Sequence, residues 1–358
     1  MFIKKLLSVL LIISMIFSLS GCGLISSLIR NADEILDELT SALEQEIEND
    51  FSDDSLTDMS PLESIESDDE SKNQSSTPLL YKVTDNKGNI IWLFGSIHVG
   101  EDYFYPLPDY VLDAFNKADS LAVEFDIVAY EKNLKAQMQS LKAFVYTDGT
   151  KISDHLPNDI YNNAKTILKE QKMYNSSMDY YNVAMWSSLI DNAIYEKIGV
   201  DYKLGVDRHL INLAYDKDKT VLDIESADFQ YNMLSGFSEK LQLMLLESSI
   251  ESYNNEVDIK MQLDGMMQVW AKGDEEKLSQ MVAEDLTDEE LTEEESKLLE
   301  EYNTKMITNR NHNMTEWAKN ALKNGKKVFI CVGAAHIVGE GAIADELEKA
   351  GYTVEIIK

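Results

Sequence analysis

Cysteine is almost absent from this 358-residue chain, which has only Cys22 and Cys331. If Cys22 carries a lipid, no disulfide can form within one chain, even in an oxidising compartment. Cys331 lies in the apolar run 328–332, where a lone cysteine usually behaves as a small hydrophobic residue. These two positions exclude a disulfide-stapled fold and give Cys331 no predicted catalytic role.

The chain also lacks an apolar run long enough for a permanent membrane span, which needs about 20 residues. It begins instead with Lys4 and Lys5, an apolar core over 6–17, and then Leu-Ser-Gly-Cys at 19–22. This order resembles a bacterial lipoprotein signal peptide, whose cysteine carries lipid after cleavage. We expect 1–21 to be the signal peptide and lipid on Cys22 to anchor the protein at the extracytoplasmic face of the membrane. An ordinary secretory signal or an N-terminal anchor helix is the alternative.

Basic residues are missing altogether between Asp33 and Glu70, and the formal net charge of the chain is -32. Binding to nucleic acid needs clustered Lys and Arg on the protein, so this class of partner is excluded. An acidic segment rich in Ser, Asn and Thr buries too little apolar surface to offset its chain entropy. The sequence predicts a flexible acidic linker over 22–77 and a folded domain over 78–358.

Two similar segments near the ends of this domain predict its core. The apolar run Ile90–Phe94 is followed by Gly-Ser-Ile-His, which ends at His98. The run Val328–Val332 is followed by Gly-Ala-Ala-His, which ends at His336. Apolar runs of this length are typical of parallel strands covered by helices on both faces. Ligands bind beyond the carboxyl ends of such strands, so both histidines are expected to face one pocket.

Carboxylates follow two further expected strands. The first is 120–126, after a helix expected to begin near Pro108, and it contains Glu124 among apolar neighbours. Burying a carboxylate there costs free energy unless it is paired, protonated or bound to metal. The alternative interpretation is that Glu124 is a solvent-facing residue at the sheet edge. The second strand covers 219–226 and ends near Glu225. Sequence alone does not decide between Glu124 and Glu225.

The remaining elements complete an α/β fold with a mixed, mainly parallel sheet, covering helices and a large helical insertion over about 128–310. A hairpin is expected over 79–94, because a glycine-containing turn separates its two apolar runs. Residues 352–357 predict a last strand at a sheet edge. His155, His209 and His312 lie in polar or helical surroundings without a matching ligand and are expected to be structural or solvated.

Two histidines and a carboxylate at strand ends suit a catalytic divalent metal ion with an open position for water. The spacing alone gives weak support, because no His-Glu-x-x-His helix is present. A metal-free alternative uses one histidine as general base toward water, with a carboxylate orienting it. Ser96 is a poor candidate for a serine nucleophile, because it does not stand in a Gly-x-Ser-x-Gly elbow.

The two Gly-x-x-His motifs, the intervening Glu124 and Arg310-Asn311 resemble the TraB/PrgY/gumN family. Gly205-Val206-Asp207, the strand to Glu225 with Gln230, and 270–274 also fit that resemblance. Its Tiki branch implies a divalent-metal-dependent protease, and more distant relatives imply an erythromycin-esterase-like hydrolase fold. Carried to this chain, the resemblance implies His98, Glu124 and His336 as catalytic and metal-binding residues, and Arg310 as electrostatic support for an oxyanion.

We therefore expect a lipid-anchored hydrolase that uses manganese, cobalt or zinc to cleave peptides or exported proteins. The alternative is a non-catalytic surface protein that sequesters peptide signals in the same cleft. The overall acidity favours cationic peptides through electrostatic steering. The sequence does not indicate the oligomeric state.

Overall fold

A computed structural model of the chain describes residues 76–284 and 291–358. The expected signal peptide, Cys22 and the linker up to residue 75 lie outside the described residues. Among the helices within these ranges, none combines the length and apolar character needed to cross a membrane.

A six-stranded mixed sheet forms the centre of the α/β part, with the order β4-β3-β5-β2-β1-β6. The strands are β1 (Leu80–Thr84), β2 (Ile90–Ser96), β3 (Ser120–Val123), β4 (Thr220–Asp223), β5 (Val328–Gly333) and β6 (Thr353–Ile357). Strands β2, β5, β3 and β4 are parallel, whereas β1 is antiparallel to both β2 and β6. The predicted fold class is confirmed, and so are the early hairpin and the C-terminal edge strand.

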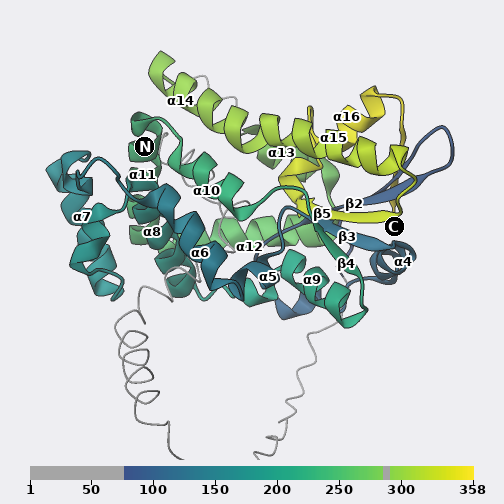
Figure 1. Ribbon diagram of the computed structural model, residues 1–358, viewed down its shortest axis with the longest axis horizontal. Helices are drawn as coiled ribbons and strands as arrows, with labels where there is room; N and C mark the ends of the chain where they lie inside the picture. The colour runs from purple at the N-terminus through teal and green to yellow at the C-terminus, as the bar shows by residue number, and fades with distance from the viewer. Residues whose placement is uncertain (1–75, 285–290) are drawn as a thin grey trace, which may run out of the picture.

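Strands β2 and β5 are almost entirely buried, which explains their continuous apolar sequences. Helices α4 (Asp109–Lys117) and α9 (Val206–Asp216) lie on one side of the sheet, and α15 (Asn309–Lys323) and α16 (Ile343–Lys349) lie on the other (Figure 1). The sheet is therefore the middle layer of a three-layer arrangement.

Most of the chain between β3 and β5 is helical, as expected. It contains α5 (Ile127–Glu131), α6 (Leu134–Ser140), α7 (Asn158–Glu170), α8 (Val183–Ile198), α10 (Ala227–Ser235), α11 (Glu239–Asn254), α12 (Glu256–Lys272), α13 (Glu275–Glu284) and α14 (Glu293–Asn303). Helices α8 and α11 pack against each other, with α7 and α12 beside them (Figure 1). This helical region also contributes β4 and α9 to the sheet layers.

Helix α12 joins the helical region to the sheet through one buried side chain. The indole Nε1 of Trp270 donates a hydrogen bond to the Gly95 carbonyl at 2.8 Å, and its ring contacts Phe94 and Phe104. This bond satisfies the carbonyl at the end of β2, where the polypeptide turns toward His98.

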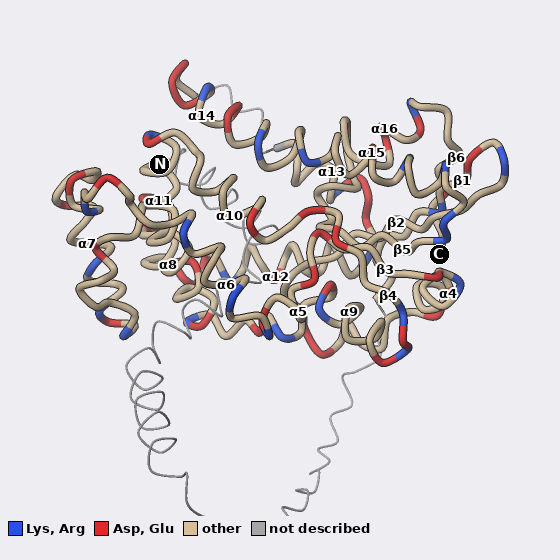
Figure 2. The backbone as a smooth tube through the Cα atoms, viewed as in Figure 1, with Lys and Arg blue, Asp and Glu red and all other residues tan. Residues whose placement is uncertain are grey.

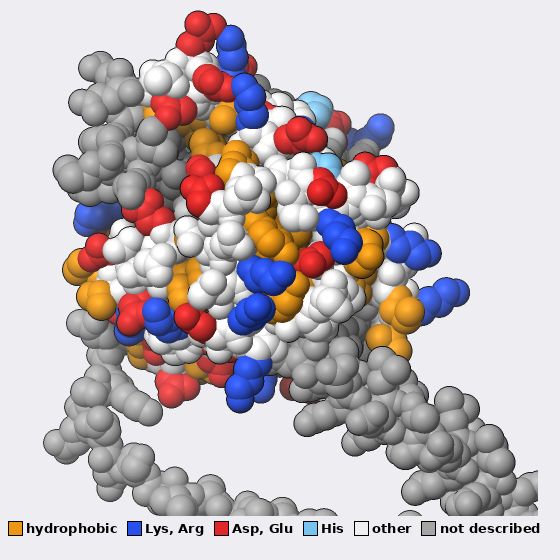
Figure 3. Space-filling model, turned by 90° about the vertical axis from the view of Figure 1, so that its left-hand side faces the viewer, with side chains coloured by type: hydrophobic (Ala, Val, Ile, Leu, Met, Phe, Trp, Pro, Cys, Tyr) orange, Lys and Arg blue, Asp and Glu red, His pale blue; other side chains and the backbone are white. Residues whose placement is uncertain are grey.

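Charged residues of both signs are spread over the described surface, on the helical region and around the sheet alike (Figure 2). On the face of the helical region drawn in Figure 3, apolar side chains form narrow strips between charged ones. Exposed apolar surface of this kind is normal for a folded domain.

Candidate functional site

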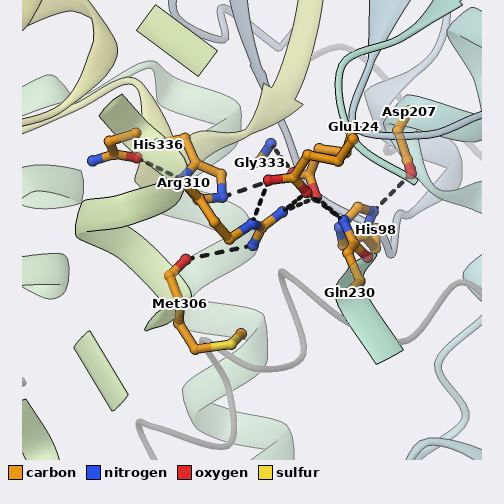
Figure 4. Close-up of polar contacts among 10 residues, drawn as sticks. His98, Glu124, Asp207, Gln230, Met306, Arg310, Gly333 and His336 are labelled. Carbon is orange, nitrogen blue, oxygen red and sulfur yellow. Dashed lines mark hydrogen bonds and ion pairs between the residues drawn. The ribbon is translucent and has the colours of Figure 1, made fainter. Parts of the chain in front are cut away.

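The candidate site lies where β2, β3 and β5 end at the same edge of the sheet (Figure 4). His98 follows β2 by two residues, and Glu124 comes directly after β3. His336 ends a short 3-10 turn that follows β5. Both histidines and the glutamate therefore lie at one edge of the sheet, as expected, but His336 is not among the residues that line the cavity beside His98 and Glu124. Strand β3 is shorter than predicted and ends at Val123, because Asp126 instead caps helix α5.

His98 is held by a carboxylate from a distant part of the chain. Its Nδ1 donates to Asp207 Oδ2 at 2.7 Å, and the two side chains are only 9% and 12% exposed. Asp207 stands in the first turn of α9, and this turn is fixed by a bond from Val206 N to Ile97 O at 2.9 Å. A side chain at Gly205 would place its Cβ 2.6 Å from the His98 carbonyl oxygen. Glycine at 205 thus permits the approach that brings Asp207 to His98.

The Asp207 carboxylate polarises the His98 ring. Burial lowers the pKa of His98, but the charge and hydrogen bond of Asp207 outweigh it, and the pKa is raised above its usual 6.5. The pKa of Asp207 is lowered, because the opposing charge and hydrogen bond of His98 exceed the effect of burial. The Nε2 atom of His98 is buried and has no hydrogen-bond partner among the described residues. It is therefore available to a small ligand.

Glu124 accepts three hydrogen bonds in the centre of the site (Figure 4). Its Oε1 accepts from the backbone N of Gly333 at 2.9 Å. Its Oε2 accepts from Arg310 Nη2 at 2.6 Å and from Gln230 Nε2 at 2.9 Å. Glu124 is only 5% exposed, so it is a buried and paired carboxylate and not the solvent-facing edge residue of the alternative interpretation, whereas its catalytic role stays a prediction.

Arg310 bridges the two glutamates that sequence analysis could not separate. Its Nε and Nη2 atoms donate to the two carboxylate oxygens of Glu225, each at 2.8 Å, while Nη2 also reaches Glu124. The guanidinium is fully buried, and its Nη1 donates to the Met306 carbonyl at 3.4 Å. Burial lowers the pKa of Arg310, but the charges of Glu124 and Glu225 raise it further, so the arginine stays charged. The Nε and Nη2 donors of Arg310 are already used by the two carboxylates. The role of Arg310 in stabilising an oxyanion therefore stays a prediction.

His336 is held in a similar way but stays neutral. Its Nδ1 lies 2.6 Å from Asn311 Oδ1, and the Asn311 amide is oriented by donating to the Gly341 carbonyl at 2.9 Å. An amide oxygen can only accept, so Nδ1 carries the proton in the neutral ring. Its Nε2 lies 3.9 Å from Glu124 Oε1. Burial, with the nearby charges of Arg310 and His98, holds the pKa of His336 well below its usual value.

The structure brings together His98, Glu124, His336, Arg310 and Glu225. Asp207, Gln230 and Asn311 had no predicted site role, although each belongs to a segment that fits the family resemblance. His209 lies outside the cluster, where its ring packs at a tilt against Tyr105 with centroids 4.3 Å apart.

A small cavity lies beside His98. Its lining includes Ser96, His98, Glu124, Asp207 and Cys331, and it offers about 10 Å³ to the centre of a water molecule. This is room for about one water. A much larger hollow of about 660 Å³ lies elsewhere, between the ends of α8 and α12, and is lined by residues such as Lys197 and Met261. It contains none of the predicted site residues, so the small cavity is the candidate reaction site.

The donor set fits a metal ion only in part. His98 offers an unpartnered Nε2, whereas the Glu124 oxygens already accept from N–H groups, one of them on a cation. Within 76–284 and 291–358, no three His, Cys, Asp or Glu side chains lie close enough together to hold a metal. The metal-ligand role of His98, Glu124 and His336 stays a prediction.

One family model and two curated relatives match the chain. The model of the TraB/PrgY/gumN family matches residues 79–356. The uncharacterized protein YbaP of Escherichia coli K12 is 24% identical over 178 residues, which are 50% of this chain and 62% of YbaP. YbaP of Shigella flexneri matches to the same extent. The alignment thus spans less than two thirds of these relatives. No solved structure matches the chain.

Proposed function

The chain belongs to the TraB/PrgY/gumN family, and from this premise and the site geometry we propose that it is a hydrolase of peptide bonds. The observation that carries the proposal is the buried His98–Asp207 pair, whose unpartnered Nε2 lies beside a cavity of about one water. A histidine oriented by a carboxylate is the usual general base for activating water.

In this reaction His98 removes a proton from the attacking water through Nε2. Asp207 accepts the Nδ1 hydrogen, which fixes the tautomer, and stabilises the imidazolium that forms. The buried cluster of Glu124, Arg310 and Glu225 ties the ends of β3 and β4 to α15 and holds the wall of the cavity. Neutral His336 faces Glu124 with its Nε2 3.9 Å from Oε1, and no proton lies between these two acceptors.

A metal-dependent form of the same hydrolase is the second candidate. The observation in its favour is that His98 and His336 are each held at Nδ1 by an oxygen, an arrangement common among metal-binding histidines. Manganese, cobalt or zinc held by these histidines, with Glu124 as third ligand, would polarise the substrate carbonyl and acidify bound water.

The proposed setting is the extracytoplasmic face of a bacterial membrane, with the protein anchored by lipid on Cys22. Peptides or exported proteins are the proposed substrates. The net charge of -32 favours cationic peptides. Equal association rates for Lys-rich and Glu-rich test peptides, with no response to salt, would contradict this preference.

The test compares the full chain, purified in mild detergent, with its His98→Ala variant on a broad peptide library. His312→Ala is the control, because the His312 side chain is 65% exposed and lies outside the site. Cleavage is expected in the wild type and the control and to be lost in His98→Ala. Chelation followed by added manganese, cobalt or zinc then separates the two candidates: activity that disappears and returns supports the metal-dependent form. If the folded wild type binds peptides but cleaves none, both hydrolase candidates are wrong and sequestration of peptide signals becomes the proposed function.

A further inference from the structure

Ser96 presents a second buried polar atom to the cavity of His98. It is the last residue of β2 and is fully buried, and it lines the same small cavity. Its Oγ lies beside the Cys331 thiol, a weak hydrogen-bonding group. The hydroxyl forms no hydrogen bond with any other described side chain or backbone group.

The Ser96 hydroxyl and the His98 imidazole do not bond to each other, although they line one cavity. Among the described residues His98 Nε2 has no partner and Ser96 Oγ has none besides the Cys331 thiol, so a hydrogen bond between Ser96 and His98 is excluded. Ser96 therefore cannot pass its proton directly to His98, as a serine nucleophile would. The cavity between them has room for about one water.

Leaving the buried His98 Nε2 without a partner costs about 1–3 kcal/mol, and the weak thiol of Cys331 satisfies the Ser96 hydroxyl only in part. A single water satisfies both atoms by donating one hydrogen to His98 Nε2 and accepting the hydrogen of Ser96 Oγ. One lone pair of the water then stays free to attack a carbonyl carbon. The attack forms a C–O bond as the water O–H bond breaks, the proton passes to Nε2 and the carbonyl π electrons move to the carbonyl oxygen. When these electrons return, the C–N bond breaks and the leaving amine takes the proton from Nε2.

We propose that Ser96 holds the attacking water of the hydrolase in line with His98, a role in which it contacts the reacting oxygen. The catalytic part of this assignment, the holding of the attacking water, rests on the proposed hydrolase function. Its structural part, a water bound between Ser96 Oγ and His98 Nε2, is independent of activity.

Two variants of Ser96 test the assignment. Ser96→Ala removes the hydroxyl, whereas Ser96→Thr keeps it. Ser248→Ala is the matched control, because Ser248 is a buried serine whose hydroxyl has no partner within the part of the chain that the structure describes, and it lies in α11 away from the site. We expect Ser96→Ala to lower kcat about 10- to 100-fold with KM nearly unchanged, since misplacing a reacting group costs this much. Ser96→Thr should recover part of the rate, and Ser248→Ala should leave it unchanged.

High-resolution crystal structures supply the readout that does not depend on activity. In the wild type a water should lie within about 3.2 Å of both Ser96 Oγ and His98 Nε2, and in Ser96→Ala it should be lost or displaced. A wild-type cavity without this water, or a Ser96→Ala enzyme with unchanged kcat, would overturn the assignment. A wild type that holds the water but cleaves no peptide would contradict the proposed hydrolase and leave the structural part of the assignment supported.

Discussion

Asp207 and His98 are 109 residues apart in sequence, yet they form a 2.7 Å hydrogen bond in the interior of the site. The carboxylate raises the pKa of His98 although burial lowers it. A general base must be neutral to accept a proton, so the acid limb of kcat/KM should follow the pKa of His98.

Asp207→Asn removes this charge. The pKa of His98 should fall, and the acid limb of the kcat/KM profile should therefore move to lower pH. The plateau rate should drop about 100-fold or more, because the ring loses its orientation and the support for its positive form. Asp228→Asn is the control, since Asp228 also stands in the first turn of a helix but outside the site. A pH–rate profile that keeps its acid limb in place would show that His98 is not the titrating base.

Gly205 is the glycine on which this pair depends. Its Cβ in Gly205→Ala would lie 2.6 Å from the His98 carbonyl oxygen and 3.0 Å from Asp207 Oδ1, so the start of α9 would have to move away. We expect a loss of stability of about 1–3 kcal/mol in denaturant unfolding and a larger fractional loss of activity.

Gly265→Ala is the matched control for this change. Gly265 is an exposed helical glycine, and its added Cβ would meet nothing within 4 Å. This variant should be more stable by about 0.5–1 kcal/mol with activity unchanged, because alanine is the better helix former. Equal changes of stability and activity in the two variants would contradict the proposed role of Gly205 in bringing Asp207 to His98.

Arg310→Met removes the cation between Glu124 and Glu225. Two carboxylates would then be buried side by side without a positively charged partner, which should destabilise the fold by about 3–5 kcal/mol near neutral pH. Arg208→Met is the control. The partner of Arg208 is Glu131, whose side chain is 19% exposed, and we expect a loss of about 1 kcal/mol of unfolding free energy. Denaturant unfolding measures both values.

A second arm tests the cause of that loss. Replacing both Glu124 and Glu225 with Gln in the Arg310→Met background should recover part of the stability, because no buried charge remains unpaired. If the loss is the same with and without the glutamates, packing of the arginine side chain, and not its charge, stabilises this cluster.

The sheet and the histidines could be predicted from sequence because local patterns determine them. An apolar run followed by Gly-x-x-His defines both the strand and the position of its histidine, as for His98 and His336. Glu124 was recognisable for the same reason, as a carboxylate after an apolar strand. The end of β3 was misplaced because capping of α5 by Asp126 depends on how the next helix is placed.

Asp207, Gln230 and Asn311 could not be assigned from sequence in the same way. Each acts by holding another site residue, and each comes from a helix whose position is set by packing. The only local signal for Asp207 is the glycine two residues before it. Its significance appears once Gly205 is seen against the His98 backbone.

Asp191 predicts a pH dependence of stability that comes from the helical region. It is buried between α8 and α11, and burial raises its pKa to about 7 although a bond with Ser249 opposes this. Its Oδ1 has no partner within the described residues. Between about pH 4 and pH 7 the unfolded chain loses the Asp191 proton while the folded chain keeps it, so stability falls as pH rises.

The wild type should therefore lose, through this residue, on the order of 4 kcal/mol of unfolding free energy across that window. Asp191→Asn should remove this part of the slope, since asparagine does not titrate. Asp113→Asn, at an exposed position of α4, should keep the wild-type slope. Urea unfolding at pH 4, 5, 6 and 7 measures the three curves. Parallel curves for the wild type and Asp191→Asn would mean that Asp191 is ionised in the folded protein throughout, and that the α8–α11 interface admits enough water to solvate it.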